Sequence, residues 1–184
     1  MFLYIYIFLQ ILLDSVEYKH LVLAFLTTHV IPEFSSPVGF IRARAMWVIE
    51  YFSELDWAAA AADSASTAEA GAGAALNNIL AGLIGGLRDP ALPVQAAAAC
   101  SLRVLLETPQ SAEYLKPMLP SIVAEYFRIM DELDNESVLS ALQAIVDQFP
   151  EEMPPMAPQM VERLIASFRR YAGEKAQGGG DDDD

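Results

Sequence analysis

The chain has 184 residues, enough for one domain with a substantial core, and its formal net charge is −14. That charge argues against direct nucleic-acid binding, which depends on a basic footprint, and favours attraction toward basic partners. An acidic surface that serves only solubility is the alternative. A single cysteine, Cys100, excludes an intrachain disulfide framework and fits a reducing compartment.

The N-terminal run MFLYIYIFLQILL is the only membrane-like stretch. As a helix it would span roughly 20 Å, short of the ~30 Å hydrocarbon core, and it lacks the basic segment that opens a signal peptide. We therefore expect a buried helix here, with residues 1–7 as a doubtful apolar N-terminus. A membrane-anchored protein that uses residues 1–13 is the alternative.

The rest of the chain has the pattern of helices separated by turns. Helices are predicted over 9–31, 38–56, 74–88, 92–107, 111–132, 136–149 and 156–172. Prolines and glycines fall between most of them, and Pro117 and Pro120 predict a kink or a shifted start inside the fifth. The low-complexity stretch 58–73, AAAAADSASTAEAGAG, is predicted to be a loop, and residues 176–184 a disordered Gly/Asp tail.

Three of these helices repeat one apolar spacing, which places four residues on one helix face. The three sets are Ile41, Ala45, Ile49 and Phe52; Val94, Ala98, Leu102 and Leu105; and Val138, Leu142, Val146 and Phe149. Each helix follows an earlier helix and a turn, so the repeat is a helical hairpin with the HEAT or armadillo period. The predicted fold is all-α, a HEAT/armadillo-like α-solenoid of about four hairpins, placed in residues 8–57 and 74–175.

The stretch HVIPEFSSPVGFIRARAMWVIEYFSEL, residues 29–55, carries a family resemblance. Its His-Val before a proline, its Phe-Ser-Ser turn, its Arg-Ala-Arg-Ala and its Trp-Val resemble the importin-β (karyopherin-β) superfamily, specifically importins seven and eight. The resemblance covers roughly residues 8–175, although alanine-rich sequence replaces the family's polar linker after the tryptophan helix. Because family members are far longer, the resemblance implies an internal mid-chain piece without the N-terminal Ran-binding repeats.

The resemblance also implies a function. It suggests a noncatalytic nuclear transport receptor without a cofactor, shuttling between nucleus and cytoplasm. Basic cargo such as ribosomal proteins or histones would be imported and released by Ran-GTP, with nucleoporins as further partners of the full-length receptor. A HEAT-repeat scaffold subunit of a multiprotein complex is the alternative from another class.

In HEAT solenoids the second helix of each hairpin usually lines the concave, partner-binding surface. Opposite the apolar faces of the three repeated helices lie mostly acidic residues, and Arg103 is the exception. The candidate cargo-facing residues are Glu50, Glu54, Glu107, Asp147 and Glu151. A basic partner would relieve the like-charge repulsion within the Glu50/Glu54 pair, whereas an ordinary solvated face is the alternative. A second acidic region lies between Arg128 and Arg163, where no Lys or Arg occurs.

Other chemistry-bearing residues are expected to have structural roles. Arg42 and Arg44 are about 200° apart on their helix, so one should reach a turn or the neighbouring repeat and the other should be solvated. Trp47 is expected to pack between adjacent hairpins, and Cys100 to be a buried, inert thiol. The sequence contains no catalytic, cofactor-binding or metal-binding motif, so no enzymatic activity is expected.

Overall fold

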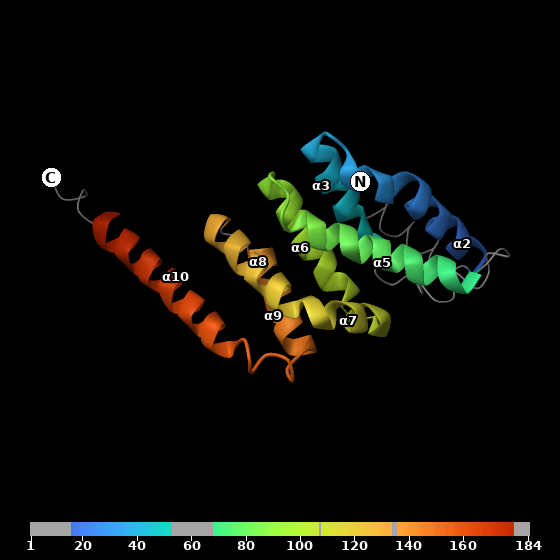
Figure 1. Ribbon diagram of the computed structural model, residues 1–184. Helices are drawn as coiled ribbons and strands as arrows, with labels where there is room; N and C mark the ends of the chain where they lie inside the picture. Colours follow the sequence, from blue (N-terminus) through green and yellow to red (C-terminus); the bar gives the residue numbers. More distant parts are fainter. Residues whose placement is uncertain (1–15, 53–67, 107, 134–135, 179–184) are drawn as a thin grey trace. The chain divides into compact units, whose positions relative to one another are not determined.

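The computed structural model describes residues 16–52, 68–106, 108–133 and 136–178, and these form helices joined by turns, with no strand among them (Figure 1). This confirms the all-α fold class. The chain forms two compact units, Met1–Gln148 and Phe149–Asp184. In the first unit the α-helices are α2 (Val16–Phe25), α3 (Gly39–Ile49), α5 (Ala68–Gly86), α6 (Leu92–Leu105), α7 (Pro109–Leu115), α8 (Leu119–Glu132) and α9 (Glu136–Gln148). The second unit contains α10 (Ala157–Gly178).

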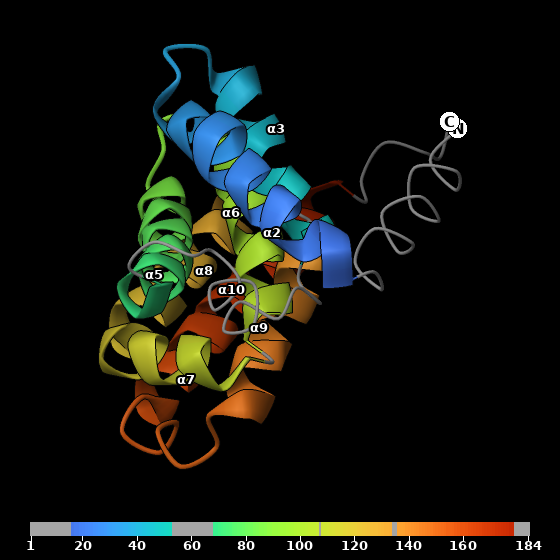
Figure 2. The same cartoon turned by 90° about the vertical axis from the view of Figure 1, so that its right-hand side faces the viewer.

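The first unit is a stack of three helical hairpins, α2–α3, α5–α6 and α8–α9. The helix α6 lies at its centre and packs against α3, α5, α8 and α9, while the short helix α7 packs against α5 (Figure 2). The second helices of the hairpins, α3, α6 and α9, are therefore neighbours in one layer. This HEAT-like arrangement is the one that the repeated apolar spacing predicts.

The central hairpin supplies the best-buried part of the core. All four apolar residues of the repeat in α6, from Val94 to Leu105, are completely buried. In α3 the residues Ala45 and Ile49 are buried, but Ile41, in the first turn of the helix, is 39% exposed. Because α3 is apolar around most of its circumference, the sequence pattern alone does not fix which side faces the core.

Two buried hydrogen bonds between hairpins fix the orientation of α6. The hydroxyl of Ser101 on α6 donates to the carbonyl oxygen of Met46 on α3 at 2.7 Å, and the Tyr126 hydroxyl on α8 donates to the Ala99 carbonyl of α6 at 2.7 Å. Both donor side chains are completely buried, so losing either bond would leave a polar group without a water partner. These two bonds therefore hold α6 against α3 and α8 and fix which of its sides faces away from the core.

The helix boundaries differ from the sequence prediction in five places. The predicted helix 9–31 ends as an α-helix at Phe25 and continues as a π-helix, Leu26–Val30, and a 3-10 helix, Ile31–Ser35. The predicted helix 111–132 is two helices, α7 and α8, separated by a 3-10 turn at Lys116–Met118 that contains Pro117, which confirms the expected interruption. The helix α3 ends at Ile49 and is followed by a 3-10 turn, Glu50–Phe52.

The alanine-rich loop is the fourth difference. The helix α5 begins at Ala68, so residues 68–73 are helical and the predicted loop 58–73 is wrong for that part. Alanine has the highest helix propensity, and here it extends a helix that is anchored by its buried C-terminal half. Likewise α10 runs to Gly178, so residues 176–178 of the predicted tail are helical. The predictions for residues 1–15, 53–67 and 179–184 lie outside the described residues. None of the described helices is both long and apolar enough to cross a membrane.

Candidate functional site

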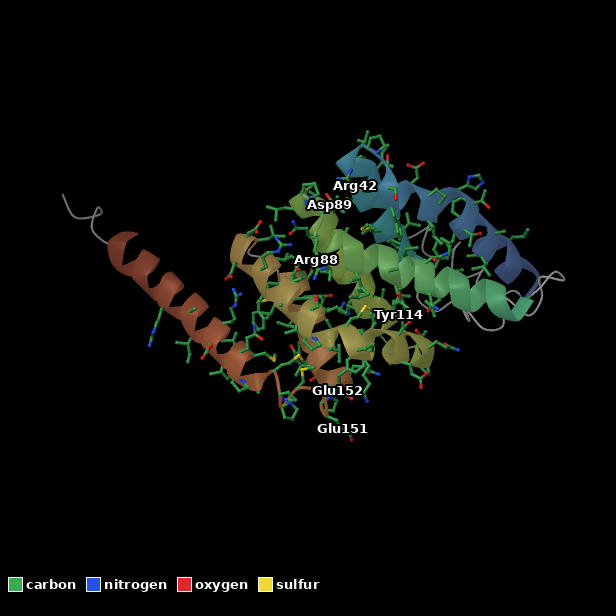
Figure 3. The ribbon with its side chains drawn as sticks, viewed as in Figure 1. Arg42, Arg88, Asp89, Tyr114, Glu151 and Glu152 are labelled. Carbon is green, nitrogen blue, oxygen red and sulfur yellow. The ribbon has the colours of Figure 1, made fainter. Side chains whose placement is uncertain are left out.

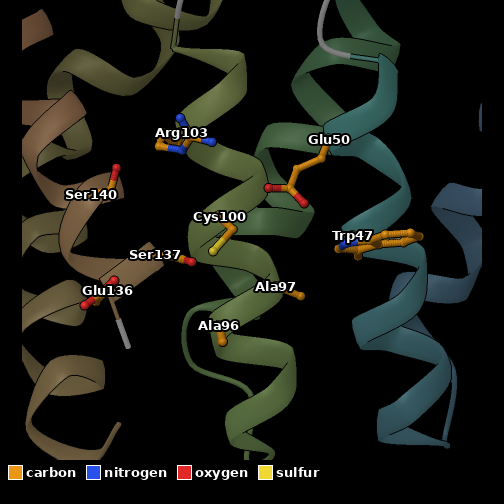
Figure 4. Close-up of a pocket in the computed structure, with 9 residues that line it drawn as sticks. All are labelled: Trp47, Glu50, Ala96, Ala97, Cys100, Arg103, Glu136, Ser137 and Ser140. Atoms are coloured by element: carbon orange, nitrogen blue, oxygen red, sulfur yellow. The ribbon is translucent and has the colours of Figure 1, made fainter. Parts of the chain in front are cut away.

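A pocket of about 610 Å³ lies where α3, α6 and α9 run side by side in the first unit (Figure 4). Its walls come from all three hairpins. The lining residues are Trp47 on α3 and Glu50 directly after it; Ala96, Ala97, Cys100 and Arg103 on α6; and Glu136, Ser137 and Ser140 on α9. The pocket therefore exists only because the hairpins stack in this order.

Small residues on α6 form the floor of this pocket. Ala96, Ala97 and Cys100 lie on the side of α6 opposite the buried Ala98 and Leu102, as the rotation of about 100° per residue requires. Their short side chains leave a hollow between the longer side chains on α3 and α9. The run of alanines that packs α6 tightly on its inner side thus also creates space on its outer side.

Charged side chains face this hollow from the 3-10 turn after α3, from α6 and from α9. Figure 4 shows the Glu50 carboxylate directed toward α6, where Arg103 extends from the floor. Burial raises the pKa of the Glu50 carboxyl, and the positive charge of Arg103 only partly opposes that effect. Glu136 lines the opposite wall, so two carboxylates and one guanidinium leave the pocket with a net negative charge.

Trp47 forms one wall of the pocket and is half-buried. The guanidinium carbon of Arg44 lies 3.9 Å from the centre of its ring, and Tyr51 meets the ring edge-on at a centroid distance of 4.5 Å. Figure 4 shows the nitrogen-bearing end of the indole directed toward α6. Both of these ring contacts are with residues of its own hairpin, and the side chain borders the pocket, so the packing of Trp47 between adjacent hairpins stays a prediction.

The thiol of Cys100 is half-buried, which corrects the expectation of a fully buried cysteine. Burial and the nearby negative charge of Glu50 raise the pKa of this thiol, while Arg103 opposes the shift. The protonated thiol is a poor nucleophile, so this environment does not activate Cys100 for catalysis. No group of three or more His, Cys, Asp or Glu side chains suited to a metal ion occurs among the described residues.

Arg42 is the arginine that reaches the neighbouring hairpin, as expected for one of the two. It pairs with Asp89 in the turn between α5 and α6, and its Nη1 donates to the Ser36 carbonyl at 2.8 Å (Figure 3). Arg44 is exposed, in agreement with the expected solvated partner, although it stacks on Trp47. Arg42 therefore anchors the N-terminal end of α3, and Arg44 supports the pocket wall.

Three of the five predicted cargo-facing residues are described by the structure, and their cargo-facing role stays a prediction. Glu50 lines the pocket, whereas Asp147 is exposed on α9 and does not. Glu151 is exposed in the second unit, in the turn that precedes α10 (Figure 3). Glu54 and Glu107 lie outside the described residues.

Several pocket residues escaped the sequence-based prediction. Arg103 is the basic exception on its face in the sequence, but only the structure shows that it lines a pocket together with Glu50. Glu136, Ser137 and Ser140 belong to the first turns of α9 and carry no motif that would mark them. The sequence signal for this pocket is the run of small residues in α6. Such a run indicates either tight helix packing or a surface hollow, and in α6 it produces both.

Comparison with known proteins places the chain in a family. It is 33% identical over 145 residues to the "Importin beta-like SAD2 homolog" of Arabidopsis thaliana, a match that covers 79% of this chain. The chain belongs to the importin-β-like family. It is also 29% identical to the "Probable importin-7 homolog" of Dictyostelium discoideum over 153 residues, and 29% identical to human "Importin-8" over 160 residues. These matches confirm the resemblance to importins seven and eight.

This importin-β-like chain spans only 13–14% of the length of those three relatives. All three relatives are named as importins or as importin-like proteins. No family model matches the chain, and no solved structure matches it.

Proposed function

We propose that this chain is part of an importin-type receptor that carries basic protein cargo into the nucleus and releases it when Ran-GTP binds. In this role it acts by binding alone and shuttles between cytoplasm and nucleus. Ribosomal proteins and histones are the cargo classes with the required charge. Ran and nucleoporins would be engaged by the intact receptor.

The observation that carries this proposal is the relationship to importin-named proteins across 79–86% of the chain. Two physical features support it. The net charge of −14 attracts basic proteins and raises their rate of encounter. The second helices of the stacked hairpins, α3, α6 and α9, form a continuous layer. The pocket in this layer has more acidic than basic groups.

The test uses the intact protein expressed from its natural gene. Immobilised protein should capture core histones or ribosomal proteins in the presence of Ran-GDP and release them when Ran-GTP replaces it. In permeabilised cells the same protein should accumulate labelled cargo in nuclei only when Ran and GTP are supplied. Cargo that stays bound in Ran-GTP, together with no nuclear accumulation, would contradict the proposal and would favour the scaffold alternative.

A further inference from the structure

The helix α10 of the second unit carries an exposed apolar stripe. Val161, Leu164 and Ile165 are 52%, 53% and 46% exposed. A helix turns by about 100° per residue, so these three side chains lie within an arc of about 100° on one side of α10. Figure 1 shows α10 as one continuous helix, so the stripe is displayed on a regular element. Large apolar side chains that are exposed side by side mark a surface for association.

We infer that this stripe pairs with the same stripe on α10 of a second copy of the chain. The two helices are antiparallel and are related by a two-fold axis that passes between Leu164 and Ile165, so that Leu164 of each copy contacts Ile165 of the other. The pairing removes the apolar side chains of both copies from water. This inference goes beyond the proposed function and does not depend on it.

Two charged residues along one edge of the stripe select a second copy as the occupant. Glu162 and Arg169 are both exposed and are seven residues apart. They therefore lie within about 20° of each other around the helix and about 10 Å apart along it, both on the side of Ile165. In the antiparallel pair, Glu162 of each copy lies beside Arg169 of the other, which makes two opposite-charge contacts by symmetry.

The order of these charges also sets the direction of the pairing. In a parallel pair, Glu162 would face Glu162 and Arg169 would face Arg169, and both contacts would be repulsive. A different protein would have to supply its own apolar stripe, with an acidic and a basic residue in the matching order, whereas a second copy has them already. Ion pairs at the rim of an interface contribute little energy, so the stripe supplies the affinity and the charges supply the orientation.

The opposite side of α10 stays outside this interface. Arg163 is about 200° from Val161 around the helix, so it lies on the far side from the stripe. The contact between the copies is therefore confined to the stripe and its Glu162/Arg169 edge. Because it is short, it forms a small interface of the kind found in weak complexes.

The experiment is sedimentation equilibrium of the full chain over a range of concentrations. We expect a monomer–dimer equilibrium with a dissociation constant in the micromolar range, in keeping with a small interface. Leu164→Gln should leave the chain monomeric at concentrations where the wild type is dimeric, since it places a polar side chain at the two-fold axis. Leu164 is exposed, so this change removes no core contact, and circular dichroism melting curves check that the variant is folded.

Charge reversals test the antiparallel arrangement. Glu162→Lys and Arg169→Glu should each raise the dissociation constant about tenfold, because each turns two attractive contacts into two repulsive ones. The double variant restores both contacts in reversed order and keeps the net charge of −14, so its dissociation constant should return to within about twofold of the wild-type value. Glu151→Lys is the matched control, since it makes the same change at an exposed glutamate of the same unit outside α10, and it should leave the dimer unchanged.

Three results would overturn the inference. The first is a chain that stays monomeric over the whole concentration range. The second is a dimer that persists in Leu164→Gln, because the copies would then associate through another surface. The third is a double charge reversal that dimerises no better than the single variants. None of these results affects the proposed transport role, whose own test measures cargo release by Ran-GTP.

Discussion

Arg42 and Asp89 join two hairpins through a bidentate ion pair. The Nε of Arg42 lies 2.7 Å from Oδ2 of Asp89, and its Nη2 lies 2.8 Å from Oδ1. Oδ1 also accepts the backbone N–H of Ala91 at 2.9 Å, just before α6 begins. A side chain of the first hairpin thus fixes the turn that leads into the central helix.

This pair predicts a pH dependence of stability. The hydrogen bonds from Arg42 hold the pKa of Asp89 below its usual range, despite partial burial. The stabilisation is therefore present above the pKa of an unfolded aspartate, about 3.9, and is lost as pH falls through the folded pKa. Asp89→Asn should lower the urea midpoint at pH 7, and its difference from the wild type should shrink below about pH 4. A difference that is constant over this range would argue against the pair as its source.

Glu50 should show the opposite sign. Its pKa is raised by burial, so the folded chain holds the proton more tightly than the unfolded chain and loses stability as pH rises through the folded pKa. Glu50→Gln should be more stable than the wild type at pH 7, by about 0.5 kcal/mol for a partly exposed carboxylate. Urea unfolding of both proteins at pH 7 and pH 4 measures the difference in their free energy of unfolding. The stabilisation by Glu50→Gln should be smaller at the lower pH. A destabilised Glu50→Gln at pH 7 would show that its attraction to Arg103 outweighs the cost of burial.

Two tyrosines allow a matched test of the bond between α8 and α6. Tyr126 is completely buried and donates to the Ala99 carbonyl, whereas Tyr114 is half-buried and has no hydrogen bond to another described residue. Tyr126→Phe should reduce the free energy of unfolding by about 1 kcal/mol, the typical net contribution of one hydrogen bond. Tyr114→Phe should change it by much less. Chemical denaturation of both variants decides the matter, and equal losses would contradict the assignment.

Glycines in α5 provide a second matched pair. A Cβ at Gly82 would clash with the ring of Phe34, while a Cβ at Gly85 would have no atom within 4 Å. Gly82→Ala should therefore destabilise the protein by roughly 1–3 kcal/mol, the usual cost of overpacking. Gly85→Ala should stabilise it by roughly 0.5–1 kcal/mol, because alanine is the better helix former. A melting temperature of Gly82→Ala that rises as much as that of Gly85→Ala would contradict the close contact between α5 and Phe34.

The sequence by itself determined the hairpin architecture of this protein. The apolar spacing in α6, from Val94 to Leu105, reports one helix face directly, and prolines such as Pro117 mark where helices end. Both signals are local, since they depend on the geometry of one helix and on residues close together in the chain. The family resemblance was readable for the same reason, from one continuous stretch that precedes and includes α3.

Only the tertiary structure decided which arginine would reach the next hairpin and where a pocket would form. The 200° separation of Arg42 and Arg44 required that they point apart, but the position of Asp89 selected Arg42. The pocket needs Glu50, Arg103 and Glu136, which come from three helices far apart in the sequence and meet only through stacking. The depth of a hollow depends on the height of side chains on neighbouring helices, and no periodicity within one helix contains that information.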